Sequence, residues 1–215
     1  MRYTSVLFDL DGTLLDTLGD LTAAMNRTLT RHGLPERTRQ QMRAALGNGA
    51  RRLMELSVPA GTDSALFETL LAEYNADYAA HCRIETAPYP GVAALLLKLH
   101  AQGRKLAIVS NKPDEAVRAL RAEFFADTVP IAVGEKQGIR RKPAPDTLLA
   151  AMEQLVADPD KTVFVGDSEV DIATARAANL PCISVLWGFR DRDVLERAGA
   201  QQFAADIAQL QALLG

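Results

Sequence analysis

Long apolar runs, paired cysteines and a strong excess of charge of one sign are all missing from this sequence of 215 residues. No run approaches the roughly 20 apolar residues that a membrane span needs, and the first residues show no signal-peptide pattern, so we expect a cytoplasmic protein. Cys82 and Cys182 lie far apart without CxxC spacing, which is typical of two reduced thiols. The formal net charge of -3 favours neither a nucleic acid nor a membrane surface as a partner.

Hydrophobic residues, in contrast, are abundant. They make up 48% of the chain, which is enough for a packed core and argues against disorder. The length suits one large domain or a domain that carries an insertion. Composition alone leaves monomer and homodimer equally open.

Short apolar runs alternate with helical patterns from about residue 86 onward. The runs cover residues 105–110, 129–134, 162–167 and 182–187, and a further run begins at Val6. Near-continuous apolar character is typical of strands that are buried on both faces of a parallel sheet. Strand and helix in alternation therefore predict an α/β protein with a doubly wound, Rossmann-like parallel sheet.

One region interrupts this alternation. Between residues 16 and 84, apolar residues follow helical spacing and no convincing strand is found. A connection of some 70 residues is too long for an ordinary βα loop, so we expect an inserted all-helical cap domain over 16–84 and a discontinuous catalytic core over 1–15 and 85–215. The insert leaves the carboxyl end of the first strand, where open α/β sheets bind ligands, so it is placed to act as a lid.

Polar residues cluster where the predicted strands end. In chain order the clusters are Asp9, Asp11 and Thr13; Ser110, Asn111 and Lys112; Lys142; and Asp167, Ser168 and Asp171. The carboxyl ends of parallel strands meet at one edge of the sheet, so all four clusters would line one crevice. Carboxylates, a lysine and hydroxyl groups in one crevice indicate metal-assisted phosphoryl transfer.

The spacing of the first cluster has an electrostatic consequence. Asp9 and Asp11 are two residues apart, so in extended backbone their side chains would point the same way. Two like charges side by side repel, and a metal ion or a proton-transfer task would explain the pair better than a structural role. Asp9 would also have to attack a negative phosphate, and at ~4 Å and an effective dielectric of ~20 each such like-charge pair costs on the order of 4 kcal/mol. A hard divalent cation with oxygen ligands, such as Mg²⁺, would relieve this repulsion.

The four clusters together resemble a known family. Asp9-Leu10-Asp11-Gly12-Thr13, Ser110, Lys142-Pro143 and Gly166-Asp167 with Asp171 match, in order, the four motifs of the haloacid dehalogenase superfamily. The resemblance covers essentially the whole chain, including a helical cap after the first strand. Four ordered motifs are far more specific than one DxDGT alone.

The resemblance implies a role for each acidic residue. Asp9 would form an aspartyl-phosphate intermediate and ligate Mg²⁺, and as a carboxylate already ionised at pH 7 it needs no base. Asp11 would protonate the leaving alkoxide, activate water and add its main-chain carbonyl as a ligand. Asp167 would be the third protein ligand, and Asp171 would orient ligands from behind them. A capping box that Asp171 forms with Ser168 is an open alternative.

The resemblance also implies a phosphate site. Ser110, with neighbouring main-chain N–H groups, Thr13 and Asn111, would hold the phosphoryl oxygens, and Lys142 would neutralise their charge. Ser110 could instead cap a helix that begins at Pro113. The segment 190–197 is read as a solvated helix face.

Within the cap, the stretch Gly47-Asn48-Gly49 followed by Arg51 and Arg52 resembles the cap loop of phosphoglycolate phosphatases. Gly49 and Arg51 could then meet the non-phosphate end of a small anionic substrate. An ordinary turn between two helices explains the same residues equally well.

The sequence thus predicts Mg²⁺-dependent hydrolysis of a small phosphomonoester through an aspartyl-phosphate, most similar to phosphoglycolate phosphatases. Asp11 favours phosphoryl transfer over dehalogenation, because a dehalogenase has no alkoxide to protonate. A phosphomutase similar to β-phosphoglucomutase and a pyrophosphatase remain alternatives within the family. A phospho-accepting signalling module is the alternative from another class, although such modules are about half this length and lack a cap.

Overall fold

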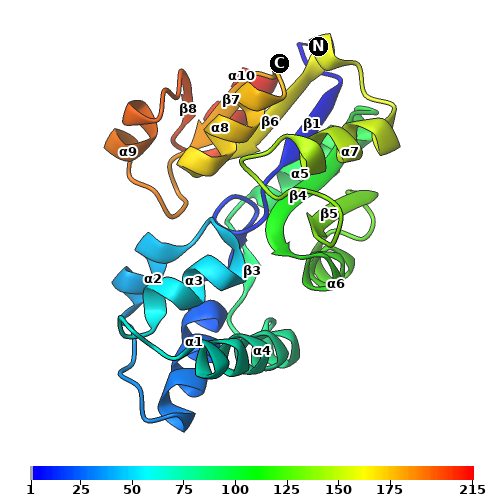
Figure 1. Cartoon of the computed structure of the whole chain (residues 1–215). Coiled ribbons are helices and arrows are strands. Elements are labelled where there is room, and N and C mark those ends of the chain that lie inside the picture. The colour runs from blue at the N-terminus through cyan, green and yellow to red at the C-terminus, as the bar shows by residue number, and fades with distance from the viewer. Residues whose placement is uncertain (1) are drawn as a thin grey trace.

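A parallel sheet forms the centre of the molecule in the computed structural model, which describes residues 2–215. Its strands lie in the order β5-β4-β1-β6-β7-β8, and every neighbouring pair is parallel (Figure 1). The strands are β1 (Ser5–Phe8), β4 (Lys105–Pro113), β5 (Ile131–Glu135), β6 (Thr162–Gly166), β7 (Cys182–Val185) and β8 (Gln202–Ala204). This order, with β1 in the middle, confirms the predicted doubly wound fold.

Helices cover both faces of the sheet. They are α5 (Val92–Ala101), α6 (Asp114–Phe124), α7 (Asp146–Leu155), α8 (Glu169–Ala177), α9 (Arg192–Arg197) and α10 (Ile207–Leu214), with a 3-10 turn at Pro159–Lys161. Alternate residues of β1 enter different cores: Phe8 belongs to a core that includes residues of α5 and α10, and its neighbour Leu7 belongs to one that includes residues of α7 and α8. Two-sided burial explains why these strands are almost continuously apolar in sequence.

A group of helices lies between two very short strands at the carboxyl end of the sheet (Figure 1). It comprises α1 (Leu18–Arg31), α2 (Arg39–Ala45), α3 (Gly49–Ser57) and α4 (Ser64–His81). The strands β2 (Leu15–Asp16) and β3 (Ala87–Pro88) pair antiparallel, so both connections to the sheet run side by side. We call these helices the cap, and the division of the chain at residues 15 and 85 stays a prediction.

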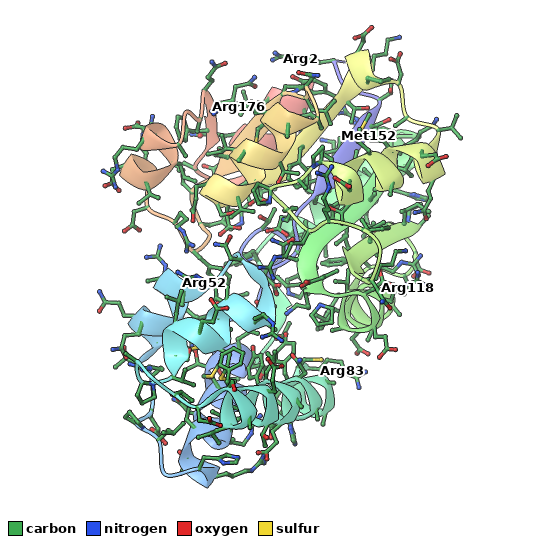
Figure 2. All side chains as sticks on the ribbon, viewed as in Figure 1. Arg2, Arg52, Arg83, Arg118, Met152 and Arg176 are labelled. Atoms are coloured by element: carbon green, nitrogen blue, oxygen red, sulfur yellow. The ribbon has the colours of Figure 1, made fainter. Side chains whose placement is uncertain are left out.

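The cap helices pack on one another through buried apolar residues, which continue into the core on one face of the sheet. Met25 and Leu29 of α1, Met54 of α3 and Leu70 of α4 are fully buried. Long charged side chains instead cover the outside of the molecule, as Arg83, Arg118 and Arg176 illustrate (Figure 2). No helix in residues 2–215 is both long and apolar enough to cross a membrane.

The observed elements differ from the predicted ones mainly at their ends. β5 is shifted to Ile131–Glu135, and β7 ends at Val185 rather than at 187. β4 continues to Pro113, and α6 begins only at Asp114. The alternative role of Ser110 as a helix cap is therefore wrong: Lys112, the residue before Pro113, favours extended backbone, and the strand continues through Ser110 to Pro113. β8 has three residues, too few for a periodic pattern to reveal it.

Candidate active site

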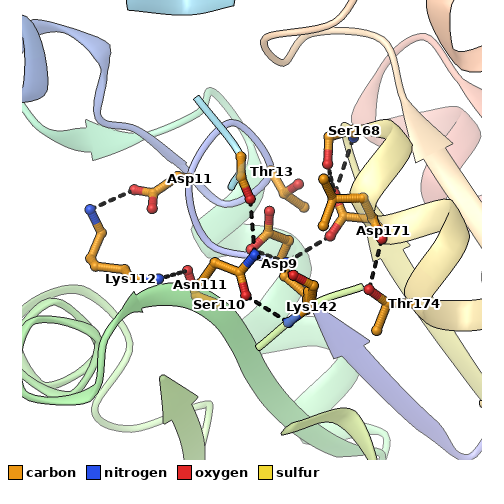
Figure 3. A network of polar contacts seen from close by, with 12 residues as sticks. Asp9, Asp11, Thr13, Ser110, Asn111, Lys112, Lys142, Ser168, Asp171 and Thr174 are labelled. Carbon is orange, nitrogen blue, oxygen red and sulfur yellow. Dashed lines mark hydrogen bonds and ion pairs between the residues drawn. The ribbon is translucent and has the colours of Figure 1, made fainter. Parts of the chain in front are cut away.

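Four chain segments bring polar side chains to the carboxyl edge of the sheet (Figure 3). Asp9 directly follows β1, Ser110 lies near the end of β4, and Asp167 directly follows β6. Lys142 comes from the loop before α7. The exposed fractions of these four residues are 7% or less, so the polar cluster is almost entirely buried. The structure thus brings together the strand-end clusters that the sequence predicts.

Lys142 joins two carboxylates. Its Nζ lies 2.8 Å from Asp9 Oδ1 and 2.7 Å from Asp171 Oδ1, and its side chain is 2% exposed. Burial alone would lower the pKa of Lys142, but Asp171 and Asp9 together raise that pKa above its ordinary value. Lys142 is therefore a permanent ammonium group held against the Asp9 carboxylate.

Asp171 is the most deeply buried of these acids. One oxygen accepts the bond from Lys142, and the other accepts hydrogen bonds from the Ser168 N–H (3.1 Å) and the Ser168 hydroxyl (2.6 Å). The two residues form a capping box at the start of α8, as one alternative from the sequence expected. Both oxygens of Asp171 have donors, which suits a residue that orients Lys142 and the other acids rather than one that reaches a ligand.

Asp167 is held by neighbours on two sides. Its Oδ1 accepts a hydrogen bond from the Thr13 hydroxyl (3.1 Å), and its Oδ2 accepts one from the Phe189 N–H (2.7 Å). Two glycines make room for it: a Cβ at Gly12, where φ is +83°, or at Gly188 would lie within 2.5 Å of an Asp167 atom. Only glycine permits this close approach, so the DxDGT motif shapes the surroundings of Asp167 as well as supplying acids.

The charge balance of the cluster indicates a cation site. One oxygen from each of Asp9, Asp167 and Asp171 lies within 4.8 Å of the others, and all three residues are buried. Burial, with Asp171 and Asp167 as neighbours, raises the pKa of Asp9 well above its usual range. Burial and Asp171 raise the pKa of Asp167 to about 7. A group of oxygen donors that repel one another in this way is chemically suited to Mg²⁺.

Asp11 lies beside this cluster and has a different partner. Its Oδ1 is 3.0 Å from the Nζ of Lys112, and its side chain is 20% exposed. Lys112 also donates a hydrogen bond of 2.8 Å to the Tyr78 hydroxyl of α4 (Figure 3 shows the ion pair). Asp11 is therefore the carboxylate that faces the cap, while Asp9 faces Lys142.

Ser110 and Asn111 take up different positions. The Ser110 hydroxyl accepts from the Lys112 N–H at 3.3 Å. The Asn111 amide donates to the main-chain carbonyls of Gly47 (3.0 Å) and Lys142 (2.9 Å), and its oxygen accepts from the Lys142 N–H (2.8 Å). Asn111 thus ties the Lys142 loop and the cap loop to β4. The phosphate-binding roles of Thr13, Ser110 and Asn111 stay predictions.

A cavity of about 240 Å³ lies between the strand ends and the cap. Its sheet side is polar and includes Asp9, Asp11, Lys142 and Asp167. Its cap side is largely apolar and includes Leu21, Leu46, Leu53, Tyr74 and Tyr78. A molecule of modest size could place a phosphoryl group at the acids and its remaining atoms beneath the cap.

The cap residues that the sequence singled out separate into two groups. Gly49 lines the cavity, and a Cβ there would lie 3.3 Å from the Asn111 carbonyl, so the cap loop meets the sheet closely. Arg51 points elsewhere: both of its terminal nitrogens donate to Glu68 at 2.8 Å, and it does not line the cavity. Its neighbour Arg52 lies on the outside of the cap (Figure 2).

The contacts of the loop after β7 were not predicted from the sequence, although a loop after a strand can approach the site. In this loop the Phe189 N–H donates to Asp167, as described above. Arg190 forms an ion pair with Glu169 at 2.8 Å. Arg190 also donates hydrogen bonds to two main-chain carbonyls of the cap, those of Arg43 (2.9 Å) and Leu46 (2.6 Å). The interpretation of 190–197 as a solvated face is wrong at Arg190, whose side chain is only 10% exposed. The two cap carbonyls are more than 140 residues away from Arg190 in sequence, and no local pattern signals these contacts.

Comparison with known proteins gives consistent matches over most of the chain. The haloacid dehalogenase-like hydrolase family matches residues 6–185. The phosphoglycolate phosphatase of Xanthomonas campestris pv. campestris is 35% identical over 192 residues, which are 88% of this chain and 86% of that protein. The N-acetylmuramic acid 6-phosphate phosphatase of Pseudomonas aeruginosa is 34% identical over 88% of this chain and 84% of its own. A crystal structure of a candidate phosphoglycolate phosphatase from Lactobacillus delbrueckii subsp. bulgaricus has a TM-score of 0.94 and 36% identity, covering 100% of this chain and 99% of that one.

Proposed function

The chain belongs to the haloacid dehalogenase-like hydrolases, and from this membership and the geometry of its site we propose that it hydrolyses a small phosphomonoester with Asp9 as the nucleophile. The family resemblance expected from the four motifs is confirmed, and the relatives indicate a phosphatase. The observation that carries the proposal is the buried contact of Lys142 with Asp9 and Asp171, at the point where β1 and β6 end.

Mg²⁺ fits this site, since burial and mutual repulsion leave the acids in need of positive charge. Asp9, Asp167 and the main-chain carbonyl of Asp11 would hold it. Asp171 would orient these ligands without binding the metal itself. When bound, Mg²⁺ would offset the negative charge of carboxylates and phosphate and so lower the barrier to attack.

The residues then divide the reaction into two displacements. In the first, an Asp9 oxygen attacks phosphorus, the bond from phosphorus to the ester oxygen breaks, and Asp11 gives its proton to that oxygen. In the second, Asp11 takes a proton from water as the water oxygen attacks the aspartyl-phosphate, which frees phosphate and restores Asp9. Lys142 stays charged throughout and stabilises the extra negative charge of each transition state.

The substrate class follows from the relatives and the cavity. Phosphoglycolate and N-acetylmuramic acid 6-phosphate, the compounds in the relatives' names, each carry a phosphate ester on a hydroxyl group and a separate carboxylate. A cavity of about 240 Å³ can hold a small leaving group of this kind. We infer that 2-phosphoglycolate is the first substrate to test, while a mutase or pyrophosphatase activity remains the alternative within the family.

The experiment is a comparison of phosphate release from 2-phosphoglycolate, N-acetylmuramic acid 6-phosphate, hexose phosphates, nucleotides and pyrophosphate, with and without Mg²⁺. We expect turnover that needs Mg²⁺ and disappears in Asp9→Asn. A preference of ~100-fold in kcat/KM for phosphoglycolate corresponds to about 2.7 kcal/mol of transition-state discrimination and would establish it as a substrate. Absence of Mg²⁺-dependent turnover on every ester would overturn the proposal.

A further inference from the structure

The cavity is lined by three cationic side chains within residues 2–215, and the contacts of two of them already assign them to the catalytic cluster or to the cap loop. Lys142 is held by two carboxylates, at 2.8 and 2.7 Å. Arg190 is held by Glu169 and by two carbonyls of the cap. Lys112 is the remaining cation, with one carboxylate at 3.0 Å and one tyrosine hydroxyl at 2.8 Å.

Lys112 is an unusual lysine for its position. It is 6% exposed, it lies on the cavity wall, and its Nζ is 4.3 Å from the centre of the Tyr78 ring. Lysine is rarely buried to this extent without full pairing, because removing an ammonium group from water is costly. An ammonium group has three protons to donate, so the contacts with Asp11 and Tyr78 leave capacity for one more acceptor.

Tyr78 adds a second donor at the same place. Its hydroxyl accepts a hydrogen bond from the Lys112 Nζ, and within residues 2–215 it donates no hydrogen bond of its own. Burial, with Asp11 nearby, raises the pKa of Tyr78 well above its ordinary value, so the hydroxyl keeps its proton. Lys112 and Tyr78 together present donors suited to a carboxylate.

The position of Asp11 sets how far this pair lies from the reacting bond. Asp11 must reach the ester oxygen to protonate it, and Lys112 touches Asp11. In phosphoglycolate the carboxylate carbon is only two bonds from that ester oxygen. The carboxylate of such a short substrate would therefore fall next to Lys112, whereas Arg51 is outside the cavity and occupied by Glu68.

We propose that Lys112 and the Tyr78 hydroxyl bind the carboxylate of the leaving group and so select phosphomonoesters that carry a carboxylate close to the ester oxygen. This inference rests on the proposed phosphatase activity. It also links selectivity to the cap, since Tyr78 belongs to α4 and Lys112 to β4.

The test compares two substrates that differ only at this group: 2-phosphoglycolate and 2-hydroxyethyl phosphate, in which CH₂OH replaces the carboxylate. In Lys112→Met we expect kcat/KM for phosphoglycolate to fall about 10- to 100-fold more than for the neutral ester, mainly through KM. The ratio between the substrates is the readout, because contact with Asp11 can change both rates together. Lys112→Gln is the second variant if Lys112→Met does not fold.

Two further variants and one binding measurement complete the design. Lys98→Met removes an exposed lysine of α5 and should leave the ratio unchanged, as should Arg51→Met. Titration calorimetry of phosphoglycolate with Asp9→Asn and with Asp9→Asn/Lys112→Met measures binding without turnover, and we expect at least tenfold weaker binding in the double variant.

The outcomes separate the two proposals. An equal loss on both substrates in Lys112→Met would show that Lys112 only positions Asp11, and a changed ratio in Arg51→Met alone would assign selectivity to Arg51; either result overturns the inference while the phosphatase activity stands. A wild-type protein that hydrolyses neither ester would instead overturn the proposed function.

Discussion

The two buried lysines of the cavity, Lys142 and Lys112, have similar exposure but opposite surroundings. Lys142 is 2% exposed and contacts two carboxylates, Asp9 directly after β1 and Asp171 in α8. Lys112 is 6% exposed and shares its bonds between Asp11 and Tyr78 of the cap. One lysine completes its pairing within the catalytic cluster, and the other is shared between the sheet and the cap.

This difference shows how one cavity can keep the same reaction while the choice of substrate changes between related proteins. Phosphoryl transfer needs the same charges for every ester, so the groups around Lys142 hold one another in place. Selection among leaving groups depends on the cap side of the cavity, where largely apolar side chains surround Lys112 and Tyr78. Changes at the Lys142 end should therefore affect all substrates, and changes at the cap end should affect some.

Lys142→Met should have the largest effect. It leaves Asp9 and Asp171 without their shared cation in a buried site, and breaking a buried pair in this way costs about 3–5 kcal/mol of folding stability. Loss of transition-state stabilisation should reduce kcat by at least about 10²- to 10³-fold on every ester. Denaturant unfolding and steady-state kinetics measure the two effects. A variant within tenfold of wild-type kcat would show that Lys142 is dispensable.

Metal-free protein should lose stability as pH rises. The pKa of Asp167 is about 7 in the folded state, against 3.8 as its ordinary value, and the pKa of Asp9 is also raised. Between about pH 4 and 7 the folded state therefore holds protons that the unfolded chain has released, so the free energy of unfolding falls with rising pH. Asp167 alone could contribute on the order of 4 kcal/mol.

Unfolding curves at several pH values, with a chelator and with excess Mg²⁺, test this repulsion between the buried carboxylates. Bound cation favours the ionised acids, so Mg²⁺ should remove the trend, and Asp167→Asn should weaken it without metal. A metal-free protein that becomes more stable from pH 5 to 8 would contradict the raised pKa values.

The Lys142 end of the cavity was largely predictable from sequence. Asp9 and Asp167 directly follow apolar strands and Ser110 ends the apolar run at 105–110, and parallel strands bring such residues to one edge. The prediction needed only the order and direction of the strands. Ligand roles within the cluster, including the Asp11 carbonyl, stay predictions.

The cap end was not predictable in the same way. Tyr78 follows helical spacing like an ordinary core residue, and nothing near it in sequence indicates that its hydroxyl reaches Lys112, 34 positions away. Arg51 has the residue type expected of an anion-binding group, yet the fold turns it toward Glu68. How a helical cap sits on the sheet depends on packing between distant segments, which local patterns do not encode.

Asp171→Asn tests whether Asp171 orients the residues that would bind Mg²⁺, and we expect an intermediate effect on activity. The amide keeps the size of the carboxylate but places an N–H donor against Lys142 or Ser168. Loss of such a supporting contact typically weakens metal binding 10- to 100-fold, so the Mg²⁺ concentration for half-maximal activity should rise by that factor. Asp193→Asn, at an exposed first-turn aspartate of α9, is the matched control. An unchanged Mg²⁺ requirement would show that Asp171 serves only its own helix.

Gly49→Ala should have the smallest effect and should be confined to the cap end. Gly49 has a φ of +78°, so a side chain there is strained by about 1–2 kcal/mol, and its Cβ would press on Arg141 and Glu135 at 3.1 Å and on the Asn111 carbonyl at 3.3 Å. Gly33 has a φ of +66° but no neighbour within 4 Å of its Cβ position, so Gly33→Ala applies the same backbone strain without the contact.

Both variants should therefore lose similar stability, as measured by denaturant unfolding. Only Gly49→Ala should raise KM for phosphoglycolate, by about three- to tenfold, because the cap loop that accepts the Asn111 hydrogen bond can no longer sit as close to β4. Its kcat should stay near the wild-type value, since the Lys142 cluster is untouched. If the two glycine variants instead gave the same KM, close contact between cap loop and sheet would not contribute to substrate binding, and selectivity would depend on the cavity wall at Lys112 alone.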